Sequence, residues 1–185
     1  MAAQPDRDAI LAEGLVAHVG VVVDGRPLVI PLLYHHEAGI VYLHGSRASR
    51  MMRHLAATAD VCLTVTIVDG LVASRSAFNH SANYRSIVVF GRSAEVRDEQ
   101  RKRDVLAAMT ARYFNGRCLG RDYEPATTKE MAITTLIAVT VEELSGKQRS
   151  GGPMSAIDAL DDHPMWAGVV DLNGRGGAVP ASPIN

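Results

Sequence analysis

Apolar and polar residues alternate along several stretches of the chain, and this pattern predicts β-strands. In the clearest stretch, Val61, Leu63, Val65 and Ile67 alternate with a cysteine and two threonines. Five more strands are predicted over apolar, β-branched runs at residues 15–23, 28–34, 40–44, 84–96 and 131–142. The dipeptide Asp24-Gly25 separates the first two runs, so those strands are expected to form a hairpin.

Three helices are predicted, one before the first strand and one after each of the third and fifth strands. A short helix is predicted over residues 5–13, and a longer one follows Asp98, its expected N-cap, and ends near Gly116. Between them, one helical face is formed by Ala48, Met51, Met52, Leu55 and Ala56. That helix is expected to begin near Arg47, with Ser46 as its cap and Gly45 as the turn out of the preceding strand.

Strands and helices do not alternate regularly, which argues against a parallel sheet. We therefore expect a mainly β protein with inserted helices, built as a six-stranded antiparallel barrel. Residues 71–83 and 118–129 are predicted to be loops. Pro31 lies within the second strand, so that strand is expected to be an edge or to carry a bulge, with backbone groups left free for a ligand.

The helix near Arg47 carries three arginines, Arg47, Arg50 and Arg53, in its opening turns, and we expect no acid to offset their charge. A helix N-terminus favours negative charge, so this composition conflicts with the helix dipole. A bound phosphate would resolve the conflict, because backbone N–H groups, a hydroxyl and guanidinium groups would meet there. The alternative is an ordinary solvated, arginine-rich helix.

The overall composition is that of a globular protein, with 47% hydrophobic and 21% charged residues in 185. The net charge of −1 predicts neither nucleic acid nor an anionic membrane as a partner. The two cysteines, Cys62 and Cys118, lack metal-ligand spacing, and no metal is expected. No signal peptide or long apolar span is recognised, which favours a cytoplasmic location.

Three segments together resemble the pyridoxamine 5′-phosphate oxidase-related family, in the branch that includes nitroimidazole-resistance proteins. They are Tyr42-Leu43-His44-Gly45-Ser46 with Ser49-Arg50, Asn83 to Gly91, and Ser145-Gly146-Lys147-Gln148-Arg149. The stretch from Asp161 to Val169, which contains Trp166, is similar to the tail of that branch. Their order and separation are more specific than any one segment.

The resemblance implies an FMN-binding split barrel over residues 1–149 and a C-terminal extension over residues 150–185 that packs on the barrel or on a dimer partner. Residues 174–185 are expected to be poorly ordered. It also implies a homodimer with a flavin in each of two clefts between the subunits. FMN is the expected cofactor, and FAD, a deazaflavin and haem are the alternatives.

By the same resemblance, the flavin phosphate would lie at Ser49 and Arg50. Backbone groups of Ile30, Pro31 and Leu32 would face the ring, and His44, Gly45 and Ser46 would line its ribityl side. Two positions depart from the oxidase pattern: Ser86 stands in place of a glutamine, and Met51 in place of a second basic phosphate ligand. Arg47 and Arg85 are the candidate substitutes for that ligand.

Further candidate site residues have two possible roles each. Lys147 and Arg149 would place positive charge beside a reduced flavin, or form a solvated strand end. Trp166 would stack on the flavin from the partner subunit, or anchor the tail. A haem-binding variant of the barrel would need a histidine such as His35, His36 or His44, and the role of His80 stays open.

The leading hypothesis is an FMN-dependent oxidoreductase that passes hydride or electrons from a reduced nicotinamide to a small acceptor, with no catalytic acid or base identified. The alternative is a non-enzymatic flavin- or haem-binding protein that acts in storage, sensing or detoxification.

Overall fold

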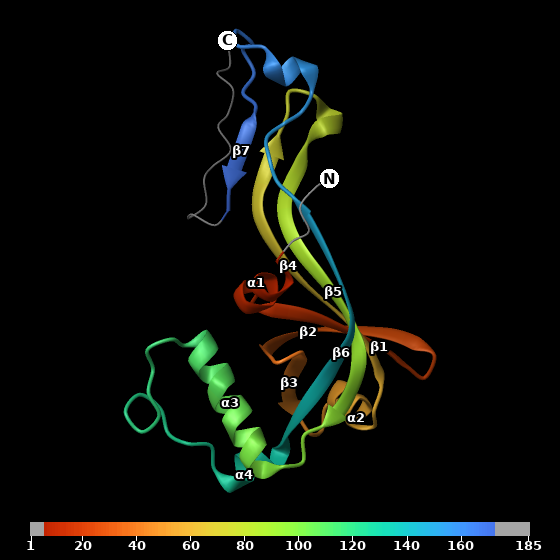
Figure 1. The fold of residues 1–185 in the computed structure, drawn as a ribbon, viewed down its shortest axis with the longest axis vertical. Coiled ribbons are helices and arrows are strands. Elements are labelled where there is room, and N and C mark those ends of the chain that lie inside the picture. The colour runs from red at the N-terminus through yellow and green to blue at the C-terminus, as the bar shows by residue number, and fades with distance from the viewer. Residues whose placement is uncertain (1–5, 173–185) are drawn as a thin grey trace. The chain divides into compact units, whose positions relative to one another are not determined.

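The computed structural model describes residues 6–172, and six of its strands form a closed antiparallel ring (Figure 1). The strands follow the order β1 (Val16–Val23), β2 (Arg26–Glu37), β3 (Ile40–Ser46), β6 (Thr134–Arg149), β5 (Ser81–Glu95) and β4 (Asp60–Ala73). A further pairing between β1 and β4, from Ala17 opposite Val65 to Gly20 opposite Cys62, closes the ring. The predicted six-stranded barrel is confirmed.

The contacts divide the chain into two units. The barrel unit comprises Leu11–Val65 and Ile87–Ser145, and the second unit comprises Thr66–Ser86 with the described residues 6–10 and 146–172. Strands β4, β5 and β6 contribute residues to both. The predicted domain boundary at residue 149 stays a prediction.

Apolar side chains from every barrel strand fill the interior of the barrel unit. Val19, Leu43, Leu63, Val89 and Ile137 are fully buried there. Their burial accounts for the alternating pattern in the sequence, because successive residues of a strand point to opposite faces of the sheet.

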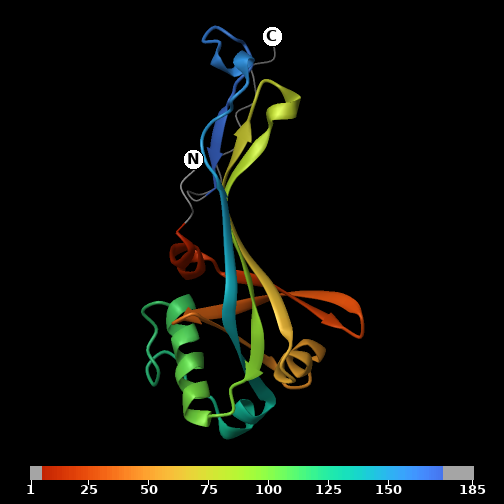
Figure 2. The ribbon, with the colours of Figure 1, turned by 45° about the vertical axis from the view of Figure 1, so that its right-hand side comes forward.

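Helix α3 (Glu99–Tyr113) covers one side of the barrel unit and lies beside β3 and β6 (Figure 2). Its Val105 and Met109 pack with Tyr42 and Leu136 in a buried cluster. Asp98 caps the helix as predicted, because its side chain accepts a hydrogen bond from the backbone N–H of Arg101 at 2.7 Å.

The remaining helices are short. Helix α1 spans Arg7–Glu13, α2 spans Arg50–Ala56, and α4 spans Thr128–Ile133. Helix α4 falls where a loop and the start of a strand were predicted. Its Thr127 and Glu130 form a capping box, a sequence signal that the strand-like run at 131–142 masked.

In the second unit, β7 (Gly168–Asp171) pairs with the end of β4, with Val170 opposite Leu71. The unit also holds two short 3₁₀ helices, Ala77–Asn79 and Ala156–Ala159. Residues 174–185, predicted to be poorly ordered, lie outside the described residues. No helix among residues 6–172 is long and apolar enough to cross a membrane.

Five strands are longer than predicted, and three of them extend through residues of the second unit. Strand β4 continues through Asp69-Gly70 to Ala73, β5 begins at Ser81, and β6 continues to Arg149. Lys147 and Arg149 therefore lie within a strand and not after its end. The predicted loop at 71–83 is reduced to residues 74–80.

Candidate functional site

A cleft of about 360 Å³ in the barrel unit brings together residues from β2, the end of β3 and the start of α2. Six residues of the predicted flavin site line it: Ile30, Leu32, Gly45, Ser46, Ser49 and Arg50. Leu28, Met51 and Met52 complete the wall. One part of the lining is therefore apolar, and another carries two hydroxyl groups and a guanidinium group.

Strand β2 presents Leu28, Ile30 and Leu32 to this cleft because these residues alternate along the strand. Pro31 lies between two of them, and its side chain points to the opposite face. Residues 26–33 of β2 pair only with β1, and residues 34–37 pair only with β3. Strand β2 lies between β1 and β3 and is not an edge strand of the sheet, but around Pro31 it pairs with β1 alone.

The start of α2 differs from the prediction. The helix begins at Arg50, Ser49 occupies the N-cap position, and β3 runs on through Ser46. Gly45 lies within the strand and not at a turn, and it packs closely against Met52, because a Cβ atom there would lie 3.0 Å from Cγ of Met52. With seven residues, α2 contributes a short dipole, so anion binding must depend on the side chains.

All three arginines near α2 already have partners, and two of them pair with acids, so the predicted absence of an offsetting acid is wrong. An Arg50 Nη2 atom lies 3.0 Å from Oδ2 of Asp24, and Arg47 Nη2 lies 3.5 Å from Oε1 of Glu95. Arg53 donates to the carbonyl oxygen of Ala48 at 2.6 Å. The acids come from distant parts of the chain, so the sequence around the helix could not identify them.

His44 lies on the face of β3 opposite to Gly45 and is not among the residues that line the cleft. It stands opposite Leu136 of β6 and follows Tyr42 on the face that α3 covers. Burial lowers the pKa of His44 below its ordinary value of 6.5. His44 therefore does not line this cleft, and its predicted ribityl contact stays a prediction.

His35 stacks on Tyr42, with ring centroids 6.3 Å apart. Burial lowers the pKa of His35, although the nearby Glu37 carboxylate opposes the shift. The Nδ1 atoms of His35 and His44 are both buried and have no hydrogen-bond partner among the described residues.

The remaining predicted site residues lie in the second unit. Arg85 makes a two-point ion pair with Asp69, at 2.6 and 3.0 Å, so its guanidinium is already engaged. Ser86 Oγ donates to the Lys147 carbonyl oxygen at 3.3 Å. The Lys147 ammonium lies 5.9 Å from the Tyr84 ring centroid.

Arg149 and Trp166 also have local neighbours in the second unit. Arg149 donates to Oδ1 of Asn83 at 2.5 Å. The Trp166 ring lies against Gly168, where a Cβ atom would be 2.6 Å from Cζ2 of the ring. This contact holds the half-buried Trp166 just before β7, and its role in flavin stacking or in anchoring the tail stays a prediction. His80 lies on the 74–80 loop, with Nδ1 3.2 Å from the Ser76 carbonyl oxygen.

A larger hollow of about 610 Å³ lies on the outer face of the barrel unit. Its lining is mainly apolar and includes the exposed residues Val22, Val29 and Phe90. Pro27 and Val29 of β2 point into it, whereas Leu28 and Ile30 point into the smaller cleft. The smaller cleft carries the cation and hydroxyl groups that an anionic ligand needs, so we assign the candidate site there.

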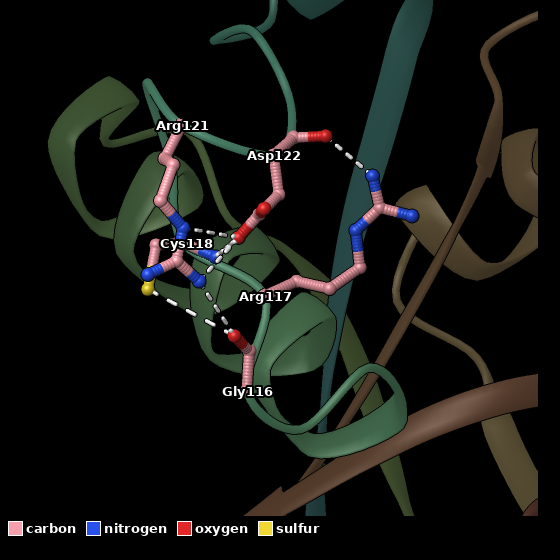
Figure 3. Close-up of polar contacts among 5 residues, drawn as sticks. All are labelled: Gly116, Arg117, Cys118, Arg121 and Asp122. Carbon is pink, nitrogen blue, oxygen red and sulfur yellow. Dashed lines mark hydrogen bonds and ion pairs between the residues drawn. The ribbon is translucent and has the colours of Figure 1, made fainter.

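A third cleft, of about 400 Å³, lies between α3 and the loop at residues 119–126. Figure 3 shows how the preceding turn is held: Asp122 accepts hydrogen bonds from Arg121 and from the backbone N–H of Cys118, and Arg117 reaches the Asp122 carbonyl oxygen. The Arg121 hydrogen bond, with that of Cys118, holds the pKa of Asp122 below its ordinary value. These hydrogen bonds hold the turn in its conformation, so these four residues are assigned a structural role.

Sequence reasoning missed Asp24 and Leu28 as neighbours of the site. Asp24 appeared only as a turn residue, because nothing local to Asp24-Gly25 indicates which helix the turn faces. By resemblance, Met51 stands at the position of a second basic phosphate ligand. It is 97% buried, and it lines the cleft with an apolar side chain.

The geometry defines a split-barrel protein with a candidate small-molecule cleft, and comparison with known proteins agrees. Residues 4–148 match the family model described as pyridoxamine 5′-phosphate oxidase. The chain therefore belongs to the pyridoxamine 5′-phosphate oxidase family. No curated protein matches it significantly.

Solved structures include two relatives above 30% identity. The FAD and haem binding protein of Mycobacterium smegmatis is 32% identical, with a TM-score of 0.80 over 98% of this chain and 88% of that one. The flavocytochrome Anf3 of Azotobacter vinelandii is 34% identical, with a TM-score of 0.76 over 96% of this chain and 80% of that one.

A candidate 5-nitroimidazole antibiotic resistance protein of Bacteroides thetaiotaomicron shares the fold at 19% identity, with a TM-score of 0.61 over 79% of this chain and 84% of that one.

Proposed function

We propose that this chain binds a flavin in the cleft between β2 and the start of α2 and acts as a flavin-dependent oxidoreductase. The observation that carries the proposal is the convergence of Ile30, Leu32, Gly45, Ser46, Ser49 and Arg50 on one cleft. These residues come from three separate elements, and the fold brings them together.

The cleft suits the chemistry of a flavin. A flavin phosphate needs hydroxyl and cationic donors, which Ser46, Ser49 and Arg50 offer. The flat ring needs an apolar wall, which Ile30 and Leu32 offer, and a volume of about 360 Å³ falls within the range of ligand pockets. A bound flavin would supply two-electron redox chemistry, taking hydride from a reduced nicotinamide and passing electrons to a small acceptor.

FMN and FAD both carry the ring, the ribityl chain and a first phosphate, so the same residues of this cleft would serve either. The two relatives above 30% identity are named for FAD and haem and as a flavocytochrome, which favours testing FAD beside FMN. The role of this chain's side chains is to bind and orient the flavin. We assign none of them as an acid or base.

A homodimer forms part of the proposal. The exposed side chains of Val22, Val29 and Phe90, at 63%, 58% and 46%, line one hollow on the barrel unit. Contiguous exposed apolar surface is typical of a protein interface. Val29→Lys is expected to shift the protein from dimer to monomer in light scattering coupled to size exclusion, and a wild type that is monomeric would refute this part.

The flavin site is tested by Arg50→Ala, with Arg92→Ala as the matched control. Arg50 and Arg92 are equally exposed, at 60% and 61%, and each lies 3.0 Å from an aspartate, but Arg92 does not line the cleft. Because a charged hydrogen bond contributes about 1.5–3 kcal/mol, Arg50→Ala should weaken FMN binding by about 10- to 100-fold.

The measurement is a fluorescence titration with FMN and FAD, beside stopped-flow reduction by NADPH. Arg92→Ala should bind flavin as the wild type does. A wild type that is colourless as purified and binds neither flavin would overturn the proposal. If the protein binds flavin but neither NADH nor NADPH reduces that flavin, the nicotinamide-dependent enzyme is refuted and a flavin carrier is the conclusion.

Haem is a second candidate ligand, because the buried Nδ1 atoms of His35 and His44 have no partner among the described residues. A histidine nitrogen is a common haem ligand. Neither ring, however, lines any of the three clefts described above. Haem binding therefore requires a Soret band in the reconstituted protein that is lost in His35→Ala or His44→Ala, and no band would exclude it.

A further inference from the structure

We propose that Asp24 is an affinity-determining residue of the flavin site, because it competes with the flavin phosphate for Arg50. This inference rests on the proposed function. It concerns a residue that lies outside the cleft lining and belongs to the turn between β1 and β2.

The first observation is the ion pair itself. Arg50 Nη2 lies 3.0 Å from Oδ2 of Asp24, and Arg50 lines the cleft. Carboxylate and phosphate oxygens are bound by the same guanidinium group, so Asp24 engages one of its five N–H donors and offsets the positive charge that would attract a phosphate. The Asp24 side chain is 84% exposed and makes no other hydrogen bond or ion pair described for this structure.

The turn holds Asp24 in place. Val23 pairs with Arg26, so the turn has two residues, and Asp24 and Gly25 have φ values of 53° and 73°. Positive φ at both central residues is the geometry of a tight hairpin turn, in which Asp-Gly and Asn-Gly are favoured. The carboxylate is therefore presented from a short, defined turn next to the cleft.

The other two arginines cannot replace Arg50 without losing contacts of their own. Arg47 is paired with Glu95, and Arg53 donates to the Ala48 carbonyl oxygen. An incoming phosphate must therefore take Arg50 from Asp24 or share it, and sharing places two anions side by side. The competition lowers phosphate affinity, and the loss depends on salt because the pair is exposed.

Asp24→Asn is a sharp test, because asparagine keeps the shape of aspartate and is equally suited to this turn. Exposed pairs contribute up to about 1 kcal/mol, so the variant should bind FMN about 3- to 5-fold more tightly at low salt, and the gain should shrink at high salt. The matched control is Asp60→Asn. Asp60 is 87% exposed and lies 3.0 Å from Arg92, so this variant makes the same charge change in an equivalent pair of the barrel unit. Asp60 lines the larger hollow, so the two variants and the wild type are compared in the same oligomeric state, which light scattering checks.

Two further measurements test whether Asp24 acts on the flavin phosphate and through Arg50. Riboflavin, which lacks the phosphate, should bind wild type and Asp24→Asn equally. In an Arg50→Ala background, Asp24→Asn should raise FMN affinity less than it does in the wild type, because the shared partner is gone and only the direct repulsion between Asp24 and the phosphate is relieved.

Equal FMN affinity of Asp24→Asn, Asp60→Asn and wild type would overturn the inference and leave the flavin site intact. A gain in riboflavin affinity equal to the gain in FMN affinity would also overturn it. A wild type that binds neither FMN nor riboflavin would overturn the proposed function, and this inference with it.

Discussion

Two arginines, one in each unit, hold main-chain carbonyl groups in the same way but in different surroundings. In the barrel unit, Arg112 donates to the carbonyl oxygens of Leu11, Ala12, Gly14 and Tyr34. In the second unit, Arg75 donates to those of Ile157, Asp158, Leu160 and Met165. Each arginine joins segments that are far apart in the sequence.

Their surroundings differ in apolar content. The Arg112 guanidinium lies over the rings of Tyr34 and Tyr113, at 4.4 and 5.2 Å from their centroids, and Tyr34 is fully buried. The segment that Arg75 holds contains the exposed Leu160 and Met165, and a carboxylate, Asp158, accepts from the Arg75 backbone N–H. Packing and Arg112 thus act together in the barrel unit, whereas residues 157–165 depend mainly on polar contacts.

The largest expected effect comes from the barrel core. Leu43→Ala removes a fully buried side chain, and a change of this kind costs about 2–5 kcal/mol in the free energy of unfolding. Urea unfolding measures it. Leu119→Ala is the control, because Leu119 is 56% exposed and the change should cost less than about 0.5 kcal/mol. Equal losses in the two variants would contradict the assignment of the core.

Arg112→Ala should have the next largest effect, a loss of about 2 kcal/mol, because partly buried carbonyl groups lose a charged donor. Arg103→Ala is a control on the same helix, since Arg103 makes a single hydrogen bond of 3.4 Å, to the Ala126 carbonyl oxygen. Arg112→Lys should recover only part of the loss, because an ammonium group lacks the planar fork. If the Arg112 and Arg103 variants have equal free energies of unfolding, the hydrogen bonds of Arg112 do not contribute to the stability of the barrel unit, and apolar packing accounts for it.

This contrast also explains how much the sequence could predict. The barrel strands and α3 were predictable because their stability comes from apolar burial, which leaves a periodic pattern in residues such as Leu63 and Met109. Residues 157–165 are held by polar contacts, in which Arg75 reaches their carbonyl groups and Asp158 accepts from the Ser74 hydroxyl and the Arg75 backbone N–H. Such contacts leave no periodic pattern in a sequence.

The candidate site divides in the same way. Resemblance located Ser49, Arg50 and the segment around Ile30, because short motifs identify local segments. The pairing of Arg50 with Asp24 and of Arg47 with Glu95 joins residues 26 and 48 positions apart, so local charge counting around α2 led to a wrong conclusion. Helix α4 was missed although Thr127 and Glu130 signal its start, because β-branched residues follow at once.

Arg75→Ala is expected to have a local effect with little global consequence. Amide hydrogen exchange should quicken at residues 157–165, because their carbonyl groups lose their shared donor. The urea midpoint of the barrel should change by less than the equivalent of about 0.5 kcal/mol. Unchanged exchange at 157–165, or a global loss as large as that of Arg112→Ala, would remove the distinction between the two arginines.

The smallest expected effect is on the pH dependence of barrel stability. Because burial lowers the pKa of His44, the unfolded chain binds a proton there more readily than the folded chain does. His44 therefore contributes its stability in full above pH 6.5, the ordinary pKa of histidine, and loses that contribution as the pH falls from 6.5 toward the lower folded pKa. The free energy of unfolding of the wild type should fall over this range more than that of His44→Gln. Since burial also lowers the pKa of His35, the single variant His44→Gln should keep part of the slope. Only the double variant with His35→Gln should approach a flat profile.

Identical profiles for wild type and His44→Gln would contradict this prediction. They would mean that the His44 ring is as hydrated in the folded protein as in the unfolded chain, although its neighbours Tyr42 and Leu136 are buried.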